Sequence, residues 1–148
     1  MSKRIVLVIA LALAVTAAAS AEIGIGAEYL YYTPGLASNA LLSLRAWPMP
    51  FQLGLGYAAG PVFTVTGDWW LKAGAISGSP LGYYVAVGGF VTLPTFTLGA
   101  RVPIGLQLWL LGDLLELFLE AVPYAGLYLT PINPMYGIGV GAGFRFWF

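Results

Sequence analysis

The 148-residue sequence contains no cysteine and no histidine, and only 8% of its residues are charged. Without cysteine, the chain has neither a disulfide framework nor a thiolate metal site. Without histidine, catalysis by a Ser–His or Cys–His pair is excluded. Ordinary globular domains carry about 25% charged residues, which cover the surface that meets water. We therefore expect that the outer surface of this protein does not face water.

The few charged residues also bound the range of functions. Only four basic residues follow residue 21, and they are scattered, so no basic patch is present to hold nucleic acid. Glu116 and Glu120 lie four residues apart. At a rise of about 3.3 Å per strand residue they are roughly 13 Å apart, which is wide for an acid–base pair. The sequence therefore predicts no catalytic, cofactor-binding or metal-binding residues, and we expect the protein not to be an enzyme.

The N-terminus has the features of a secretory signal peptide. Lys3 and Arg4 precede an unbroken apolar run over residues 5–15, and Ala19-Ser20-Ala21 supplies the small residues of a cleavage site. The run is short for a membrane-spanning helix of about 20 residues, although an uncleaved anchor helix is the alternative. The sequence thus predicts a cleavable signal peptide at 1–21, cleaved after Ala21, and a single domain at 22–148.

The last thirteen residues alternate strictly in character. Every second residue is apolar: Tyr136, Ile138, Val140, Ala142, Phe144, Phe146 and Phe148. The positions between them hold glycines, Arg145 and Trp147. A period of two indicates a strand with two unlike faces. One wide apolar face and one small or charged face suit the wall of a membrane barrel.

Seven earlier segments repeat this alternation, separated by turn residues. They cover residues 22–32, 40–47, 51–59, 62–72, 81–93, 96–111 and 114–129, and residues 136–148 form the eighth. Spanning helices are not expected, because the best window, residues 102–128, holds three acidic residues and two prolines. We predict an all-β fold, an eight-stranded antiparallel up-and-down transmembrane β-barrel with both termini on the periplasmic side. A soluble barrel with an apolar interior is the alternative.

The charged residues within these segments all lie at the alternate positions that the apolar residues do not occupy, and so on the opposite face of each strand. They are Glu28, Arg45, Asp68, Lys72, Arg101, Glu116, Glu120 and Arg145. A charge facing lipid near the midplane costs about 2–4 kcal/mol, so we expect all eight to face the interior. Loop lengths predict that Glu28 faces Arg45 and that Glu120 faces Arg145, with Arg145 beside Glu28 where the barrel closes. We interpret this row of alternating charges as a structural device that fixes register, and a proton or ion path is the alternative.

Aromatic residues gather near both ends of the predicted strands on the apolar face. Tyr31, Tyr57 and Tyr136 lie near one end, whereas Phe51 and Trp69 lie near the other. This placement is typical of the two aromatic girdles of a membrane barrel, with a platform that binds sugars or aromatic molecules as the alternative.

The tail Gly143-Phe144-Arg145-Phe146-Trp147-Phe148 resembles the C-terminal assembly signal of bacterial outer-membrane proteins. In that group, the barrel-assembly machinery recognises a terminal aromatic residue and the alternating apolar residues before it. The matching positions here are Tyr136, Ile138, Val140, Phe144, Phe146 and Phe148. Over residues 22–148 the chain is similar to small OmpA- and OmpX-type barrels of an uncharacterised subgroup. The resemblance implies residence in the outer membrane of a double-membrane bacterium, with membrane lipid and the assembly machinery as partners.

The chain departs from both named types in ways that bear on function. It lacks a periplasmic peptidoglycan-binding domain, and its predicted outer loops are short, so neither cell-wall tethering nor adhesion through long strands carries over. Eight strands leave room only for side chains, whereas an open channel needs about sixteen. We expect a small integral barrel with a structural, envelope-integrity role and a non-conducting interior filled by paired charges. The alternative is a surface binding protein, either an adhesin or an apolar-ligand binder acting through loops or lumen, and no specific ligand or cofactor is predicted.

Overall fold

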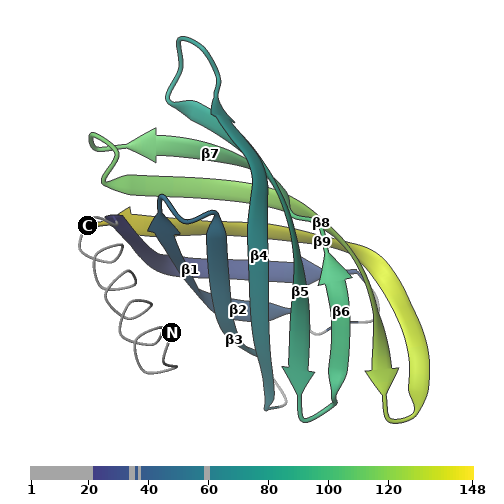
Figure 1. The fold of residues 1–148 in the computed structure, drawn as a ribbon. Coiled ribbons are helices and arrows are strands. Elements are labelled where there is room, and N and C mark those ends of the chain that lie inside the picture. Colours follow the sequence, from purple (N-terminus) through teal and green to yellow (C-terminus); the bar gives the residue numbers. More distant parts are fainter. Residues whose placement is uncertain (1–21, 34–35, 37, 59–60) are drawn as a thin grey trace, which may run out of the picture.

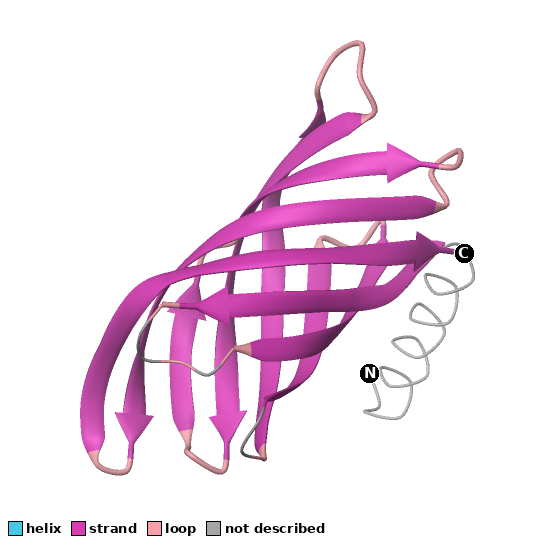
Figure 2. Cartoon of the chain, turned by 180° about the vertical axis from the view of Figure 1, so that it is seen from behind, coloured by secondary structure: helices cyan, strands magenta, loops and turns pink. Residues whose placement is uncertain are grey.

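The computed structural model describes residues 22–33, 36, 38–58 and 61–148. The predicted signal peptide, with its cleavage residues Ala19 and Ala21, lies outside the described residues. Within them, all regular structure is β-strand (Figures 1 and 2). The strands are β1 (Glu22–Tyr32), β2 (Asn39–Trp47), β3 (Phe51–Ala58), β4 (Val62–Ala75), β5 (Leu81–Leu93), β6 (Thr97–Arg101), β7 (Ile104–Leu110), β8 (Leu115–Leu129) and β9 (Ile132–Trp147).

The strands close into one antiparallel barrel. Apart from β6 and β7, consecutive strands pair with each other, and β1 pairs with β9, which closes the sheet. The strands β6 and β7 follow one another along the same line, both between β5 and β8. Counting them as one gives eight positions around the barrel, which confirms the predicted strand number and antiparallel order.

The predicted strand over residues 96–111 is interrupted at Val102 and Pro103. Proline has no N–H to donate to a neighbouring strand, so the regular pairing stops there. The neighbours still hold the break in place, because Ala86 N donates to Pro103 O at 2.8 Å and Val102 N donates to Pro123 O at 2.9 Å. Pro123 itself does not interrupt β8. The inward and outward phase is the same on both sides of the break, as the sequence predicts.

The barrel has two unlike ends. We call the end with Glu22 and Phe148 the terminal end, where Ile23 and Phe148 exchange backbone hydrogen bonds of 3.0 Å. The hairpin of β4 and β5 projects beyond the wall at this end (Figure 1). The opposite end, which we call the loop end, carries the connections at residues 33–38, 59–61, 94–96 and 130–131.

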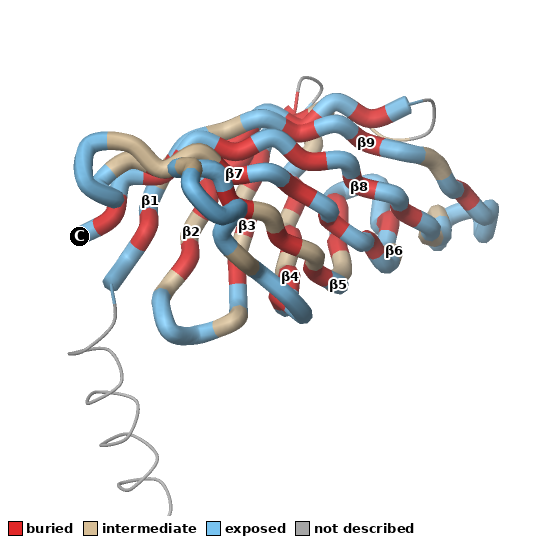
Figure 3. The backbone as a smooth tube through the Cα atoms, turned by 90° about the horizontal axis from the view of Figure 1, so that it is seen from above, coloured by how far each residue is buried: buried red, intermediate tan, exposed pale blue. Residues whose placement is uncertain are grey.

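Buried and exposed residues alternate along every strand (Figure 3). The outward positions are almost all apolar or aromatic, with Leu, Ile, Val, Tyr, Phe and Trp side chains exposed. Inside, an apolar plug fills the loop end: Leu30, Tyr32, Leu41, Phe90, Val122, Tyr124 and Met135. Charged and aromatic side chains fill the rest of the interior.

Candidate functional site: the barrel interior

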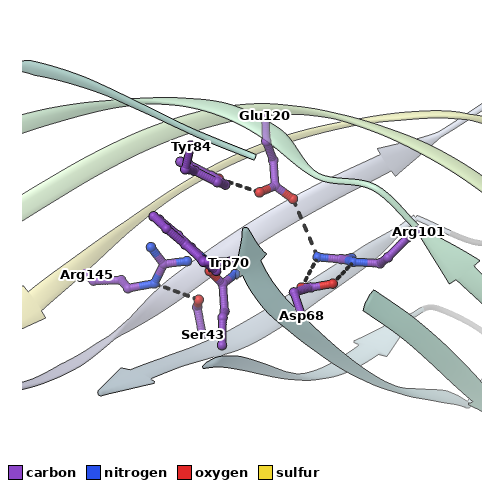
Figure 4. Close-up of polar contacts among 8 residues, drawn as sticks. Ser43, Asp68, Trp70, Tyr84, Arg101, Glu120 and Arg145 are labelled. Carbon is purple, nitrogen blue, oxygen red and sulfur yellow. Dashed lines mark hydrogen bonds and ion pairs between the residues drawn. The ribbon is translucent and has the colours of Figure 1, made fainter. Parts of the chain in front are cut away.

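The first interior charge cluster joins four strands, β4, β5, β6 and β8. Arg101 on β6 makes two hydrogen bonds of 2.8 Å to the carboxylate of Asp68 on β4, through Nε and Nη2 (Figure 4). The same Nη2 lies 3.6 Å from Glu120 Oε1 on β8. Tyr84 on β5 donates its hydroxyl to Glu120 Oε2 at 2.5 Å. Paired, two-point contacts of this kind are the strongest that a guanidinium makes, and they tie four strands together across the interior.

The second cluster is centred on Glu116 of β8. Arg145 on β9 lies opposite it, with Nη1 2.9 Å from Glu116 Oε1, and donates from Nε to Ser43 Oγ at 2.9 Å. Glu116 also accepts from Trp147 Nε1 at 2.9 Å and from Gln107 Nε2 at 2.5 Å. The carboxylate is therefore compensated by one cation and two neutral donors, as a buried charge requires.

Arg45 is held by aromatic rings. Its guanidinium carbon lies 3.4 Å from the centroid of the Trp70 ring and 5.5 Å from that of Trp147. Trp70 in turn stacks on Tyr84, with centroids 4.1 Å apart and an interplanar angle of 13°. Such stacking stabilises a cation and suits the flat guanidinium group. Within the described residues, no hydrogen bond or ion pair of the Arg45 guanidinium is found.

Glu28 is buried and has no ion pair in the described part of the chain. It approaches Glu120 above Gly141, where an added Cβ would lie 2.9 Å from Glu120 Cγ and 3.1 Å from Glu28 Oε1. Glycine at this position thus leaves space for both carboxylate side chains. Two acidic groups brought together in a poorly solvated interior disfavour each other when both are charged.

Seven of the eight charges predicted to face the interior are buried there: Glu28, Arg45, Asp68, Arg101, Glu116, Glu120 and Arg145. The prediction for Lys72 is wrong, because this residue is exposed. A bulge between Trp70 and Lys72 inserts Leu71 as an extra residue and reverses the phase of the rest of β4. The interior therefore holds four carboxylates and three guanidinium groups in place of the predicted balance.

The predicted pairs between strands are also wrong. Glu28 faces Leu41, and Arg45 faces Gly24. On the other side, Arg145 faces Glu116, while Glu120 faces Gly141. Where the barrel closes, Arg145 faces Gly26, two positions from Glu28. Both hairpin errors amount to four residues. At β8–β9 the strand β9 begins at Ile132, four residues before the predicted start. At β1–β2 the last pair is Leu30 with Asn39, so Tyr31 and Tyr32 extend beyond the pairing and the connection is not symmetric.

Uncharged interior partners escaped the sequence analysis. Ser43, Trp70, Tyr84, Gln107 and Trp147 all contact the buried charges. Their position in the alternating pattern could have identified them, because each lies between outward-facing apolar residues of its strand. The residues of the predicted assembly signal, Tyr136, Ile138, Val140, Phe144, Phe146 and Phe148, are all exposed on the outer wall.

A cavity of about 520 Å³ opens at the terminal end of the interior. Arg45, Gln107 and three tryptophans lie among its lining residues. A shallower hollow of about 330 Å³ lies beside Tyr84, Gly105 and Ala121 and is mostly apolar. The larger of these two hollows thus opens at the terminal end, whereas the apolar plug fills the loop end.

No group of three or more acidic, histidine or cysteine side chains is placed to bind a metal ion in the described ranges. Nor do these residues include a helix long and apolar enough to cross a membrane. Function therefore has to be inferred from the geometry of the wall and the interior. The chain matches no protein-family model, and neither a curated protein nor a solved structure matches it.

Proposed function

We propose that the protein is a small integral outer-membrane barrel of a double-membrane bacterium, with a structural role in envelope integrity and a non-conducting interior. The observation that supports this most strongly is the division of side chains across the wall. Large apolar residues face outward, whereas seven of the ten charged residues described are buried inside. Soluble barrels have the opposite division.

The remaining charges support the same proposal by their position. Glu22, Lys72 and Asp113 are exposed, and all three lie at the terminal end. Lys72 belongs to the part of β4 beyond its pairing with β3, which ends at Trp69, so it stands on the projecting hairpin. In the described part of the chain, Lys72 is therefore the one charged residue within a strand that faces outward, opposite Val85, and it lies towards the terminal end. A lipid-facing charge near the bilayer midplane would cost about 2–4 kcal/mol.

Aromatic side chains on the outer wall are consistent with two interfacial girdles. Tyr29, Tyr31, Tyr57 and Tyr136 are exposed towards the loop end. Towards the terminal end the exposed aromatic residues on the outer wall are Phe51, Trp69, Phe146 and Phe148. Between these groups the outward residues are chiefly Leu, Val, Ile and Ala. Amphipathic rings at both edges of an apolar band suit the two boundaries of a bilayer.

The filled interior supports a non-conducting barrel. The apolar plug, the two charge clusters and the stacked rings follow one another from the loop end towards the terminal cavity. An eight-stranded barrel has room for side chains and little else. Reconstitution into planar bilayers should therefore give no discrete conductance steps, and regular steps would contradict this part of the proposal.

The proposal is tested by expressing the full chain in a double-membrane bacterium and separating the membranes by density. We expect the protein in the outer-membrane fraction, and we expect the unheated sample to migrate differently from the boiled one on a gel. Recovery in the soluble fraction, or no heat-dependent shift, would overturn it. In the native host, loss of the protein should increase entry of large antibiotics. Unchanged permeability would refute the structural role while leaving the location intact.

The terminal cavity favours a second candidate function, binding of a small molecule in the interior. Its volume of about 520 Å³ is within the range of ligand pockets, about 300–1,000 Å³. The loop-end connections, by contrast, are short and carry no charged residue. They offer little of the roughly 800 Å² that each partner contributes to a standard protein interface. Binding through the interior is therefore better supported than adhesion through the loops.

A further inference from the structure

The terminal cavity combines one buried cation with an aromatic wall. Its lining includes Arg45, Trp47, Leu81, Gln107, Trp109 and Trp147. These residues come from β2, β5, β7 and β9, so the cavity exists only when the barrel is closed. We propose that it binds a small amphipathic organic acid, with the anionic head on Arg45 and the apolar body against the tryptophans. This inference deepens the second function proposed above, and it depends on the closed barrel and not on membrane location.

Arg45 supplies the site for the anionic head. The residue is only 6% exposed, yet its guanidinium has no ion pair or hydrogen bond within the described residues. Trp70 covers one flat face at 3.4 Å, whereas the Trp147 ring lies further away at 5.5 Å. Arg45 also lines the cavity, so we infer that its free N–H groups can meet a partner there. A buried cation without an anionic partner is unfavourable, and a carboxylate beside these N–H groups would receive charge-assisted hydrogen bonds.

The other two interior cations in the described residues are already paired. Arg101 is bound to Asp68, and Arg145 is bound to Glu116. Glu116 does not contact Arg45 as an ion pair, since its oxygens are taken by Arg145, Gln107 and Trp147. Among the interior cations of the described strands, Arg45 is therefore the one left for a ligand that enters from the terminal end.

The tryptophans supply the surface for the apolar body. Trp109 and Trp147 lie next to each other, with centroids 5.6 Å apart at an angle of 47°. The Trp147 N–H is used by Glu116, so this residue offers its ring face and not its donor to the cavity. Trp47 stands at the outer edge and is 53% exposed. Rings of this kind bind flat apolar groups with little loss of side-chain entropy.

Two acidic residues on the cavity rim set the orientation of the ligand. Glu22 and Asp113 line the opening and are exposed to solvent. Water screens their charges more than it screens the buried Arg45, so an anionic head is favoured deep in the cavity and disfavoured at the opening. A cationic ligand would take the reverse arrangement, with its head between the two carboxylates. The difference in burial leads us to choose the anion.

The head-group preference is tested with three probes that share one ring system: 2-naphthoate, 2-naphthamide and 2-naphthylmethylammonium. Titrations of the purified barrel are followed by calorimetry and by the indole N–H resonances of the tryptophans. We expect 2-naphthoate to bind at least tenfold more tightly than the neutral amide, because only the carboxylate adds an opposite charge to the hydrogen bonds from the guanidinium. Equal affinity for acid and amide, tighter binding of the ammonium probe, or no binding of 2-naphthoate would each overturn the proposal.

Matched variants locate the site. Trp47 and Trp69 are exposed to the same extent, 53% and 54%, but only Trp47 lines the cavity. Trp47→Ala should weaken 2-naphthoate binding severalfold, whereas Trp69→Ala should leave it unchanged. Equal effects of the two substitutions would place the binding outside the cavity and refute the site.

Arg45→Gln tests whether the positive charge of Arg45 is needed for ligand binding or only for folding of the barrel. It should abolish the preference for acid over amide while the unheated gel shift shows that the barrel still closes. If Arg45→Gln does not close, Arg45→Lys keeps the charge, and the point-like ammonium should weaken acid binding relative to the planar fork. Retained acid preference in a closed Arg45→Gln barrel would contradict the role of Arg45. These measurements use the purified barrel. A negative result would therefore refute the binding site without bearing on the proposed envelope role.

Discussion

Arg145 and Glu116 face each other across β8 and β9, with Arg145 Nη1 2.9 Å from Glu116 Oε1 and both side chains fully buried. The pair joins the C-terminal strand, which also closes the barrel against β1, to the strand before it. Arg145 extends further and reaches Ser43 on β2 across the interior. One side chain near the end of the chain thus contacts strands on two sides of the barrel.

Removing Arg145 should destabilise the barrel strongly. Arg145→Leu leaves Glu116 buried without its cation, and breaking a buried pair in this way costs about 3–5 kcal/mol. The free energy of unfolding in urea, measured on the protein in lipid vesicles, should fall by that amount. Lys72→Leu is the control, since it removes a charge that lies outside the interior and should change stability by less than about 0.5 kcal/mol. Similar effects of the two substitutions would contradict the assigned pairing.

Because carboxylates outnumber guanidinium groups in the interior, we expect substitutions of two buried glutamates to change stability differently. Glu28 and Glu116 are both buried, but only Glu116 has an ion pair among the described residues. Glu28→Gln should leave stability within about 1 kcal/mol of the wild type or raise it, because it removes an uncompensated charge. Glu116→Gln should cost about 3 kcal/mol or more, because it strands Arg145. The urea midpoints of the two variants compare them directly, and the reverse order would show that Glu28 is the better compensated group.

The sequence predicted the face correctly for seven of the eight strand charges, all but Lys72, whereas the predicted strand pairings were wrong. Face and pairing depend on different physical information. The face of a residue follows from a period of two within one strand, so Glu28, Arg101 and Arg145 could be assigned from their apolar neighbours. Pairing depends on where a hairpin turns. Residues 132–135, read as loop because of Asn133 and Pro134, are paired strand, which moves the partner of Arg145 from Glu120 to Glu116.

The placement of Lys72 shows a limit of period counting. Trp69, Trp70 and Leu71 are three large apolar residues in succession, and this run breaks the alternation without showing which residue is extra. The bulge is fixed by the partner strand, where Trp70 pairs with Ala86 and Lys72 pairs with the adjacent Val85. The position of the bulge therefore depends on the pairing with β5 and cannot be predicted from the sequence of β4 alone. The ring contacts of Arg45 likewise depend on strands brought together only by closure.

The closing contact between β1 and β9 depends on a glycine. A Cβ at Gly26 would lie 1.7 Å from the carbonyl oxygen of Phe144, which belongs to the backbone of β9 and has no rotamer by which to move away. Gly26→Ala should therefore separate the two strands and cost about 1–3 kcal/mol or more. The fraction of protein that shows the unheated gel shift measures this loss.

Gly67→Ala is the matched control for that substitution. The nearest atom to its added Cβ is Phe51 Cζ at 3.3 Å, the far end of an exposed side chain. A ring that faces outward can shift by the small amount required, so Gly67→Ala should fold as the wild type does. A barrel that tolerates Gly26→Ala as well as Gly67→Ala would show that β1 and β9 are not packed as closely as described.

The central claim is that the apolar outer wall contacts lipid hydrocarbon while the opposite face of each strand is enclosed. Trp69 and Trp70 test it most directly, because they are adjacent in sequence but 54% and 6% exposed, respectively. Fluorescence quenching by brominated phospholipids would be compared in Trp69→Phe and Trp70→Phe barrels reconstituted in vesicles. We predict that Trp69→Phe removes a strongly quenched component and that Trp70→Phe leaves this component in place. Loss of the quenched component in Trp70→Phe, or no lipid quenching of Trp69 at all, would contradict the account.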